Sequence, residues 1–117
     1  MAYVDGFVVP VKKARVDEYK KLAELADEVW REHGAIAYVE CLADDVPDGE
    51  LTSFPRAVQL QDDEVVGFAW IVYRSREQRD EVNRKVMEDP RIRPQQQDWP
   101  FEGRRLIFGG FVPFIGL

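Results

Sequence analysis

The chain has 117 residues, of which 45% are hydrophobic and 32% are charged, and this balance suits one folded domain over residues 1–117. Its net charge of -6 and isoelectric point near 4.8 argue against nucleic acid and anionic membrane partners, and its apolar stretches are too short to span a bilayer. Cys41 is the single cysteine, which excludes an intrachain disulfide, and the N-terminus lacks the features of a signal peptide, so we expect a cytoplasmic protein.

The first part of the chain predicts a strand followed by a long helix. Residues 3–9 alternate in polarity and are rich in β-branched and aromatic side chains, which predicts a strand that Pro10 closes. Residues 15–33 carry apolar side chains at helical spacing, which is typical of an amphipathic helix. Gly34 follows directly and can adopt the left-handed conformation that ends a helix.

The next segment predicts a second strand, a loop and a short helix. Residues 35–42 alternate again, and we expect Cys41 to pack inertly in this strand. Residues 44–52 hold the proline and Asp-Gly signals of a loop. Ser53 is a suitable N-cap for a short helix that extends to about residue 60.

A third strand and a second long helix follow in direct succession. In residues 65–73 the side chains at odd and at even positions are both apolar. This strand should therefore be covered on both faces and lie in the middle of a sheet. Ser75 can cap the helix while Gln78 reaches back in a capping box, and Asp89 and Pro90 end it.

The last segment completes the fold. Residues 91–103 predict a loop held by Pro94 and Pro100, and residues 106–112 predict a final strand. The resulting β-α-β-β-α-β order, with a short helix before the third strand, is the α+β ferredoxin-like sandwich of one antiparallel sheet and two helices. One sheet face stays uncovered in a monomer although the third strand is apolar on both sides. We therefore predict a homodimer that buries this face.

Four segments, in order along the chain, carry a family resemblance. They are residues 3–11 (YVDGFVVPV), 29–41 (VWREHGAIAYVEC), 53–58 (SFPRAV) and 75–91 (SREQRDEVNRKVMEDPR). On these segments the chain resembles, nearly end to end, the uncharacterised family called domain of unknown function 1428. The resemblance implies a dimeric α/β barrel built from two ferredoxin-like subunits. Related dimeric barrels include cofactor-free oxygenases, haem-degrading enzymes and muconolactone isomerases, which is an analogy of fold and not of reaction.

Two residues are candidates for acid-base catalysis. His33 is the single histidine and lies at the end of the first predicted helix, where it could transfer a proton to a small organic ligand or could cap the helix carbonyls. Asp5 interrupts an apolar strand, where a carboxylate is costly unless it is paired or hydrated. It could deprotonate a ligand, or it could form a salt bridge. The arginines that we consider as partners for such strand acids are Arg56, Arg104 and Arg105.

Further residues are candidates for ligand binding. Glu40 is a second strand acid with the same two interpretations, and the third strand should keep it about 10 Å from the first acid. Arg79 and Asn83 lie one helical turn apart on the sheet-facing side of their helix, where they could contact a ligand or fix the helix to a neighbouring segment. Trp30, Trp70 and Tyr38 could form an aromatic wall for a planar ligand, or could pack in the core.

These candidates support two hypotheses of different classes. The first is a homodimeric barrel that binds a small apolar or aromatic molecule between sheet and helices, with oxygenase-like or isomerase-like activity that needs no cofactor. The alternative is a non-catalytic dimer that acts through protein contacts. We expect no metal and no cofactor, because one histidine and one cysteine do not supply a zinc site and no nucleotide-binding glycine pattern is present.

Overall fold

The computed structural model describes residues 1–92 and 98–117, so the predicted role of Pro94 in the loop lies outside the described residues. The elements are β1 (Tyr3–Lys12), a 3-10 turn (Lys13–Arg15), α1 (Val16–Glu32), β2 (Ala37–Leu42), α2 (Phe54–Ala57), β3 (Glu64–Tyr73), α3 (Arg76–Glu88) and β4 (Ile107–Phe111). This order confirms the predicted α+β, ferredoxin-like fold.

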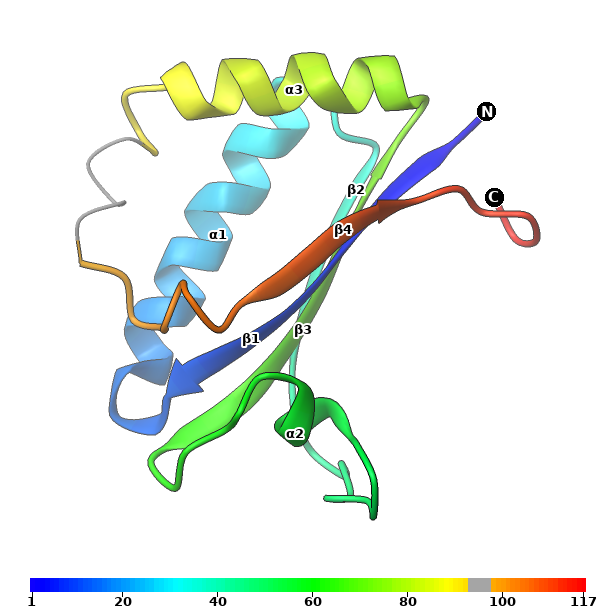
Figure 1. Cartoon of the computed structure of the whole chain (residues 1–117). Helices are drawn as coiled ribbons and strands as arrows, with labels where there is room; N and C mark the ends of the chain where they lie inside the picture. The colour runs from blue at the N-terminus through cyan, green and yellow to red at the C-terminus, as the bar shows by residue number, and fades with distance from the viewer. Residues whose placement is uncertain (93–97) are drawn as a thin grey trace.

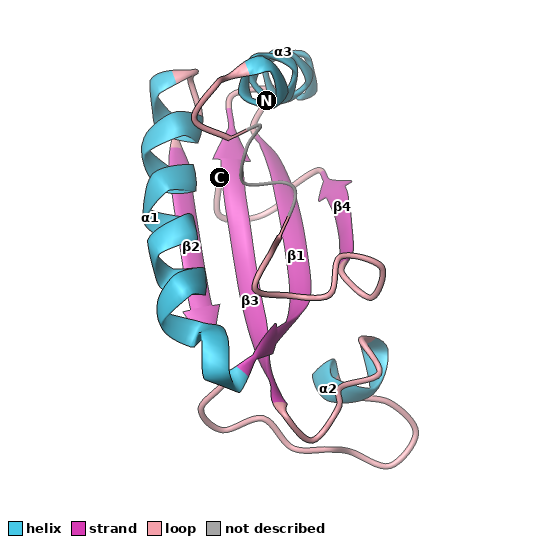
Figure 2. Ribbon diagram, turned by 90° about the vertical axis from the view of Figure 1, so that its left-hand side faces the viewer, coloured by secondary structure: helices cyan, strands magenta, loops and turns pink. Residues whose placement is uncertain are grey.

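The four strands form one antiparallel sheet in the order β2-β3-β1-β4 (Figure 1). The two central strands are β1 and β3. They pair over their whole length, because the first residue of β1, Tyr3, is opposite the last residue of β3, Tyr73, and Lys12 is opposite Glu64. Both long helices lie on one face of the sheet, with α1 along the β2 side and α3 across one end (Figure 2). The central position of β3 is therefore as its doubly apolar pattern predicted.

Strand β1 is longer than predicted, because Pro10 does not end it. Pro10 pairs with Val66 of β3, and its carbonyl accepts a hydrogen bond from the N–H of Glu102 at 3.3 Å. The N–H that proline lacks would point to the same edge of the strand as this carbonyl, away from β3. Pairing with β4 stops at Val8, so proline interrupts no ladder bond there.

Helix α3 begins with a modified form of the predicted capping box. The Ser75 hydroxyl accepts a hydrogen bond from the Gln78 N–H at 3.0 Å, as predicted. The Gln78 side chain, however, accepts from the N–H of Arg74 rather than from that of Ser75, at 2.6 Å. Its amide also donates to the carbonyl of Gly34 at 2.8 Å, which ties the start of α3 to the segment after α1.

Helix α2 ends earlier than the expected residue 60. Ser53 is its N-cap, since its hydroxyl accepts from the N–H of Arg56 at 3.2 Å. The backbone of Gln59 has a φ of 49°, which is outside the right-handed helical region and stops the helix.

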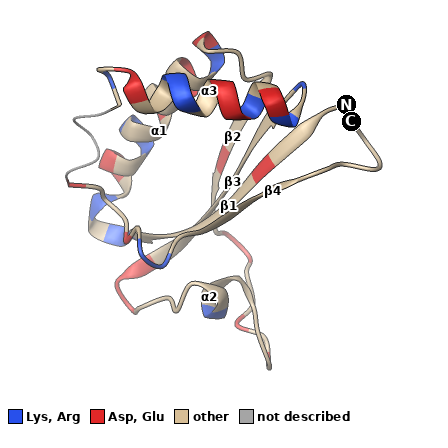
Figure 3. Ribbon diagram, turned by 45° about the horizontal axis from the view of Figure 1, so that its top comes forward, with Lys and Arg blue, Asp and Glu red and all other residues tan. Residues whose placement is uncertain are grey.

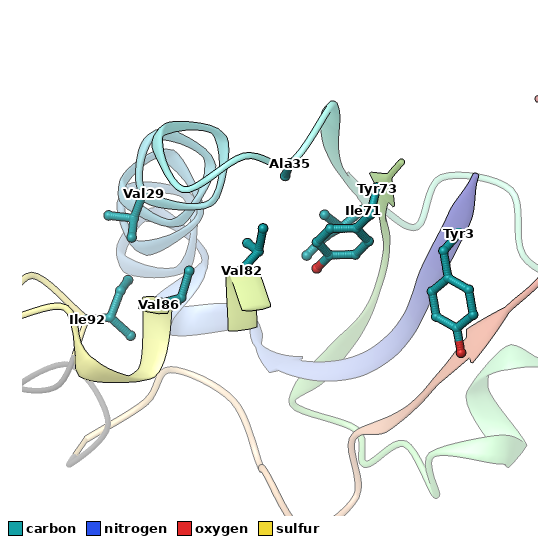
Figure 4. Close-up of a cluster of buried hydrophobic side chains, with 8 residues drawn as sticks. All are labelled: Tyr3, Val29, Ala35, Ile71, Tyr73, Val82, Val86 and Ile92. Atoms are coloured by element: carbon teal, nitrogen blue, oxygen red, sulfur yellow. The ribbon is translucent and has the colours of Figure 1, made fainter. Parts of the chain in front are cut away.

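Two clusters of buried side chains hold the helices to the sheet. The larger one joins α1, α3 and β3 (Figure 4), and it consists of Tyr3, Val29, Ala35, Ile71, Tyr73, Val82, Val86 and Ile92. The smaller one contains Val9, Val11 and Tyr19. Each buried aliphatic side chain of this kind stabilises the fold by about 1.5 to 3 kcal/mol relative to an exposed one.

The sheet face away from the long helices keeps an apolar surface. Phe68, Ile107 and Phe111 on this outer face remain 39%, 44% and 63% exposed. Helix α2 covers part of it, since the rings of Phe54 and Phe68 meet edge-on at 5.6 Å. Cys41 is exposed, so the prediction that it packs in a buried strand is wrong.

The charged side chains are distributed differently from the apolar ones. Figure 3 shows the charged residues mainly on the helices and loops, while the strands carry few charges: acidic positions in β1, β2 and the start of β3, and Lys12 at the end of β1. Within the described residues, no helix has the length and apolar character needed to cross a membrane.

Candidate functional site

A cavity of about 750 Å³ lies between the long helices and the sheet. Side chains from all four strands and from both long helices line it, and small residues such as Ala26 on α1 and Ala69 on β3 leave its interior open. Phe108 on β4 belongs to its lining and is 73% exposed, so the cavity reaches solvent beside this strand. The volume is in the range of sites that hold small organic molecules.

One end of the cavity is organised around Asp5 of β1. Its carboxylate is buried, and Oδ1 lies 3.6 Å from Nε of Arg79 on α3. Burial raises the pKa of Asp5 above its ordinary value. The positive charge of Arg79 opposes this rise, as do the nearby polar side chains of Tyr73 and Asn83. The site thus holds a carboxylate in an environment that makes it a better proton acceptor than one in water.

Arg79 is held over the end of the sheet by Tyr3. Its guanidinium carbon lies 4.9 Å from the centre of the tyrosine ring, and Nη2 donates to the tyrosine hydroxyl at 3.1 Å. The buried Nε–H has no hydrogen-bond acceptor among the described residues. Gly110, which pairs with Asp5 across the sheet, makes this arrangement possible, because a Cβ there would overlap Tyr3 Oη and Arg79 Nη2.

Asn83, one turn after Arg79 on α3, connects three elements. Its Oδ1 accepts hydrogen bonds from the indole N–H of Trp30 on α1 at 3.2 Å and from the hydroxyl of Tyr73 on β3 at 3.3 Å. These contacts hold the two helices at a fixed separation above the sheet. They also orient the Asn83 amide group toward Asp5.

Glu40 of β2 lies in another part of the same cavity. Its two carboxylate oxygens accept hydrogen bonds from the hydroxyls of Tyr19 at 2.5 Å and Tyr38 at 2.6 Å. Burial raises the pKa of both tyrosines, and the adjacent charge of Glu40 raises it further. Both phenols therefore stay protonated at neutral pH and donate to the carboxylate.

The arginines considered as partners of the strand acids contact other acids. Arg56, Arg104 and Arg105 pair with Asp48, Glu102 and Glu64, respectively. That prediction is wrong because the partner of Asp5 is Arg79 on α3, which folds over the end of β1. The sequence alone does not show that these two segments meet. In the Arg105 pair the Glu64 carboxylate is buried, and hydrogen bonds from Arg105 lower the pKa of Glu64 to about 2.

His33 has a different place from the other candidates. It does not belong to the described lining of the cavity, and its Nε2 lies 2.8 Å from Oδ2 of Asp89 at the end of α3. Arg91 also bonds to this carboxylate, and the hydrogen bonds from Arg91 and His33 hold the pKa of Asp89 well below its usual range. The histidine side chain therefore joins the ends of α1 and α3, which neither of its sequence-based interpretations anticipated.

Trp70 also lies away from the cavity. It alternates with Ala69 and Ile71, which line the cavity, so its side chain is on the outer face of the sheet. There its ring packs against that of Phe68, with the centroids 5.9 Å apart. The sequence-based candidates that the structure brings together around one cavity are Asp5, Trp30, Tyr38, Glu40, Arg79 and Asn83.

The sequence did not single out several residues that shape the site. Tyr19 fits the apolar spacing of its helix and did not stand out as a polar residue, although its hydroxyl donates a hydrogen bond to Glu40. Tyr3 is the first residue of β1 and Tyr73 is the last residue of β3. Their hydroxyls are hydrogen-bonded to Arg79 and Asn83, respectively. A tyrosine that faces the core is a usable signal, because a buried hydroxyl needs a polar partner.

The described residues contain no group of three or more His, Cys, Asp or Glu side chains placed to hold a metal ion. The site offers instead two carboxylates, a guanidinium, an amide and several phenols around an apolar space. Such groups can bind, orient and exchange protons with an organic molecule.

Comparison with proteins of known structure supports the fold alone. The chain is similar to the structure of Rv0793 from Mycobacterium tuberculosis, with a TM-score of 0.58 and 17% identity over 99% of this chain and 98% of the other. It is also similar to a NIPSNAP family protein from Agrobacterium tumefaciens strain C58, with a TM-score of 0.57 and 16% identity over 97% of this chain and 87% of the other.

Sequence relatives are much closer. The chain is 47% identical over 115 residues to the uncharacterized protein YbaA of Escherichia coli K12, which covers 98% of each chain. The same identity and coverage hold for YbaA of Shigella flexneri. The family described as protein of unknown function DUF1428 matches residues 2–103. The chain therefore belongs to the DUF1428 family, as its four characteristic segments predicted.

Proposed function

We propose that this protein binds a small apolar or aromatic molecule in the cavity between sheet and helices, and that Asp5 removes a proton from it. The observation that carries the proposal is the buried carboxylate of Asp5, which faces an open apolar cavity and has its pKa raised by burial. A cavity closed entirely by packed aromatic and aliphatic side chains would have favoured the non-catalytic alternative.

The proposed step requires no cofactor. A C–H bond next to a ligand carbonyl breaks, its electrons move into the carbonyl to form an enolate, and the proton goes to Asp5. Arg79 neutralises the developing enolate oxygen, and Asn83 holds the carboxylate in place. Isomerases return such a proton at another carbon, and cofactor-independent oxygenases let the carbanion react with molecular oxygen. Both activities begin with the same proton transfer.

A simple probe tests this step. The ketone 2-indanone has an aromatic body and acidic protons next to its carbonyl, and ¹H NMR in D₂O measures their replacement by deuterium. We expect the protein to accelerate this exchange. The acceleration by Asp5→Asn should be smaller by a factor of at least about ten, since a general base contributes roughly 10²- to 10⁴-fold to a rate. The matched control is His33→Asn, which alters a titratable side chain outside the cavity lining and should keep the rate. Exchange no faster than with an equal concentration of acetate would contradict the proposal.

We also propose that the protein is a homodimer. Support comes from the outer sheet face, where Phe68, Ile107 and Phe111 are exposed on a surface that no long helix covers. Exposed apolar side chains gathered on one face are typical of an interaction surface. A second copy that presents the same face would bury both, because a two-fold axis makes one patch its own partner.

A further inference from the structure

The second acid of the cavity, Glu40, differs from the buried acids of this protein in its partners. Asp5, Glu64 and Asp89 are buried, and each lies within 4.0 Å of an arginine side chain. Glu40 forms no ion pair among the described residues, and its two oxygens contact only the neutral hydroxyls of Tyr19 and Tyr38. A partly buried carboxylate with neutral partners keeps an uncompensated negative charge in the cavity.

Aromatic rings extend in a continuous series on both sides of this carboxylate. On one side Tyr19 meets Phe101 edge-on at 5.9 Å, and Phe101 stacks on Trp99 at 4.6 Å. On the other side Tyr38 lies 5.9 Å from Trp30. All of these rings line the cavity, so Glu40 lies at the middle of an aromatic arc.

Each oxygen of Glu40 has an acceptor position that no hydrogen bond uses among the described residues. A carboxylate oxygen offers about two acceptor positions, and each oxygen of Glu40 uses one for a tyrosine hydroxyl. Because both phenol protons point at the carboxylate, the tyrosine oxygens also present only acceptor positions to the cavity. A ligand group that donates hydrogen bonds fits this part of the wall, whereas a carboxylate or phosphate would be repelled.

We infer that the aromatic arc around Glu40 binds an organic ammonium group, so that the ligand of this cavity is an arylalkylamine, with the amine on an alkyl chain attached to an aromatic ring. The ring faces attract the positive charge, the carboxylate neutralises it, and the ammonium N–H groups occupy the free acceptor positions. This inference rests on the proposed function, since it names the chemical class of the molecule that the cavity holds.

The charges near the arc agree with a cationic ligand. Arg79 is the cation that lines this cavity among the described residues, and it is engaged with Asp5, two strands away from Glu40. On the other side of the wall, Glu40 borders an outer groove that Glu24, Asp27 and Lys20 also line. The separation of two strands between Glu40 and Asp5 places the ammonium about 10 Å or more from the proton-accepting end, which an arylalkylamine with a short chain can span.

Three probes of nearly equal size and shape separate the possibilities: 2-phenylethylamine, which is a cation at neutral pH, neutral 2-phenylethanol and the anion 3-phenylpropanoate. Binding to the ¹⁵N-labelled protein is followed by changes in amide chemical shifts. We expect the amine to bind at least about tenfold more tightly than the alcohol, and the anion to bind most weakly. Salt at 0.5 M should reduce the difference between amine and alcohol.

A pair of variants assigns the preference to one residue. Glu40→Gln keeps an oxygen that accepts from a tyrosine but removes the charge, and it should bind amine and alcohol equally. Glu24→Gln removes the same charge from the outer groove and should keep the preference. Thermal unfolding of both variants shows whether each is folded, and the ranking of probes on the unaltered protein tests the inference even if Glu40→Gln does not fold.

The outcomes distinguish the inference from the proposal beneath it. Equal binding of the three probes, or a preference that survives Glu40→Gln, would overturn the ammonium site while leaving a ligand-binding cavity. If none of the probes shifts amides of the cavity strands, both the ammonium site and small-molecule binding are contradicted.

Discussion

Asp5 on β1 and Arg79 on α3 face each other with 3.6 Å between Oδ1 and Nε, and this pair joins the start of the chain to the helix that crosses the sheet. Arg79 lies far from Asp5 in sequence, so the pair forms only after the helix has packed. It places one charge of each sign at the same end of the cavity.

Replacing Arg79 by leucine should leave the buried Asp5 carboxylate without its cation. We expect the free energy of unfolding at pH 7 to fall by about 2 kcal/mol and the pKa of Asp5 to rise further. Urea unfolding gives the first quantity, and the ¹³C shift of the Asp5 carboxyl group gives the second. The double variant Asp5→Asn with Arg79→Leu should recover part of the loss. Full stability of Arg79→Leu would show that the pair contributes nothing.

The close approach at Gly110 predicts a site-specific effect of one methyl group. Gly110→Ala places its Cβ on Tyr3 Oη and Arg79 Nη2, so it should lower the unfolding free energy by about 1 to 3 kcal/mol. The adjacent Gly109→Ala is a matched control, because its Cβ would meet the Phe111 ring at an ordinary distance of 3.7 Å. Thermal or urea unfolding compares the two. Equal losses would mean that the space above Gly110 is not restricted.

The pairing of the buried Glu64 carboxylate with Arg105 predicts a loss of stability in acid. The folded pKa of Glu64, about 2, lies below its ordinary value of roughly 4.3. Its contribution is therefore fully present above about pH 5 and is lost as the pH falls toward 2. Unfolding of the unaltered protein and of Glu64→Gln should differ most near neutral pH and converge in this window. A difference that does not change with pH would contradict the assignment.

Two phenylalanines on opposite faces of β4 test the homodimer. Phe111 is 63% exposed on the outer face, and Phe108 is 73% exposed on the helix face. Light scattering should give a mass twice that of the 13.6 kDa chain. Phe111→Asp should return the protein to a monomer, while Phe108→Asp should leave the dimer intact. A monomer that persists at high concentration would exclude this interface.

The element order and the sheet topology could be predicted because they depend on local patterns. The apolar side chains on both faces of β3 predicted its place at the centre of the sheet, and Ser53 and Ser75 indicated where two helices start. Pro10 was misassigned because the sequence does not show where a neighbouring strand stops. Its missing N–H is harmless only since β4 has already ended.

The candidate site was predicted in part for the same physical reason. Residues on the inner face of a strand or helix follow from periodicity, which placed Asp5, Glu40 and Asn83 around the cavity. Their partners depend on how the helices cross the sheet, which periodicity does not determine. The tyrosines that bind Glu40 and the link between His33 and Asp89 could therefore only come from the folded structure.

The most direct test of the account is an NMR titration of the ¹⁵N-labelled protein with 2-indanone, compared with the variant Ala69→Phe. Ala69 is buried at the cavity wall in the middle of β3, so a phenyl ring there would fill the space that a ligand needs. The account predicts shifts at cavity-lining positions of β1, β2 and α1 that disappear in Ala69→Phe. Shifts that persist in the variant, or that map to the outer face around Trp70 and Phe111, would contradict it.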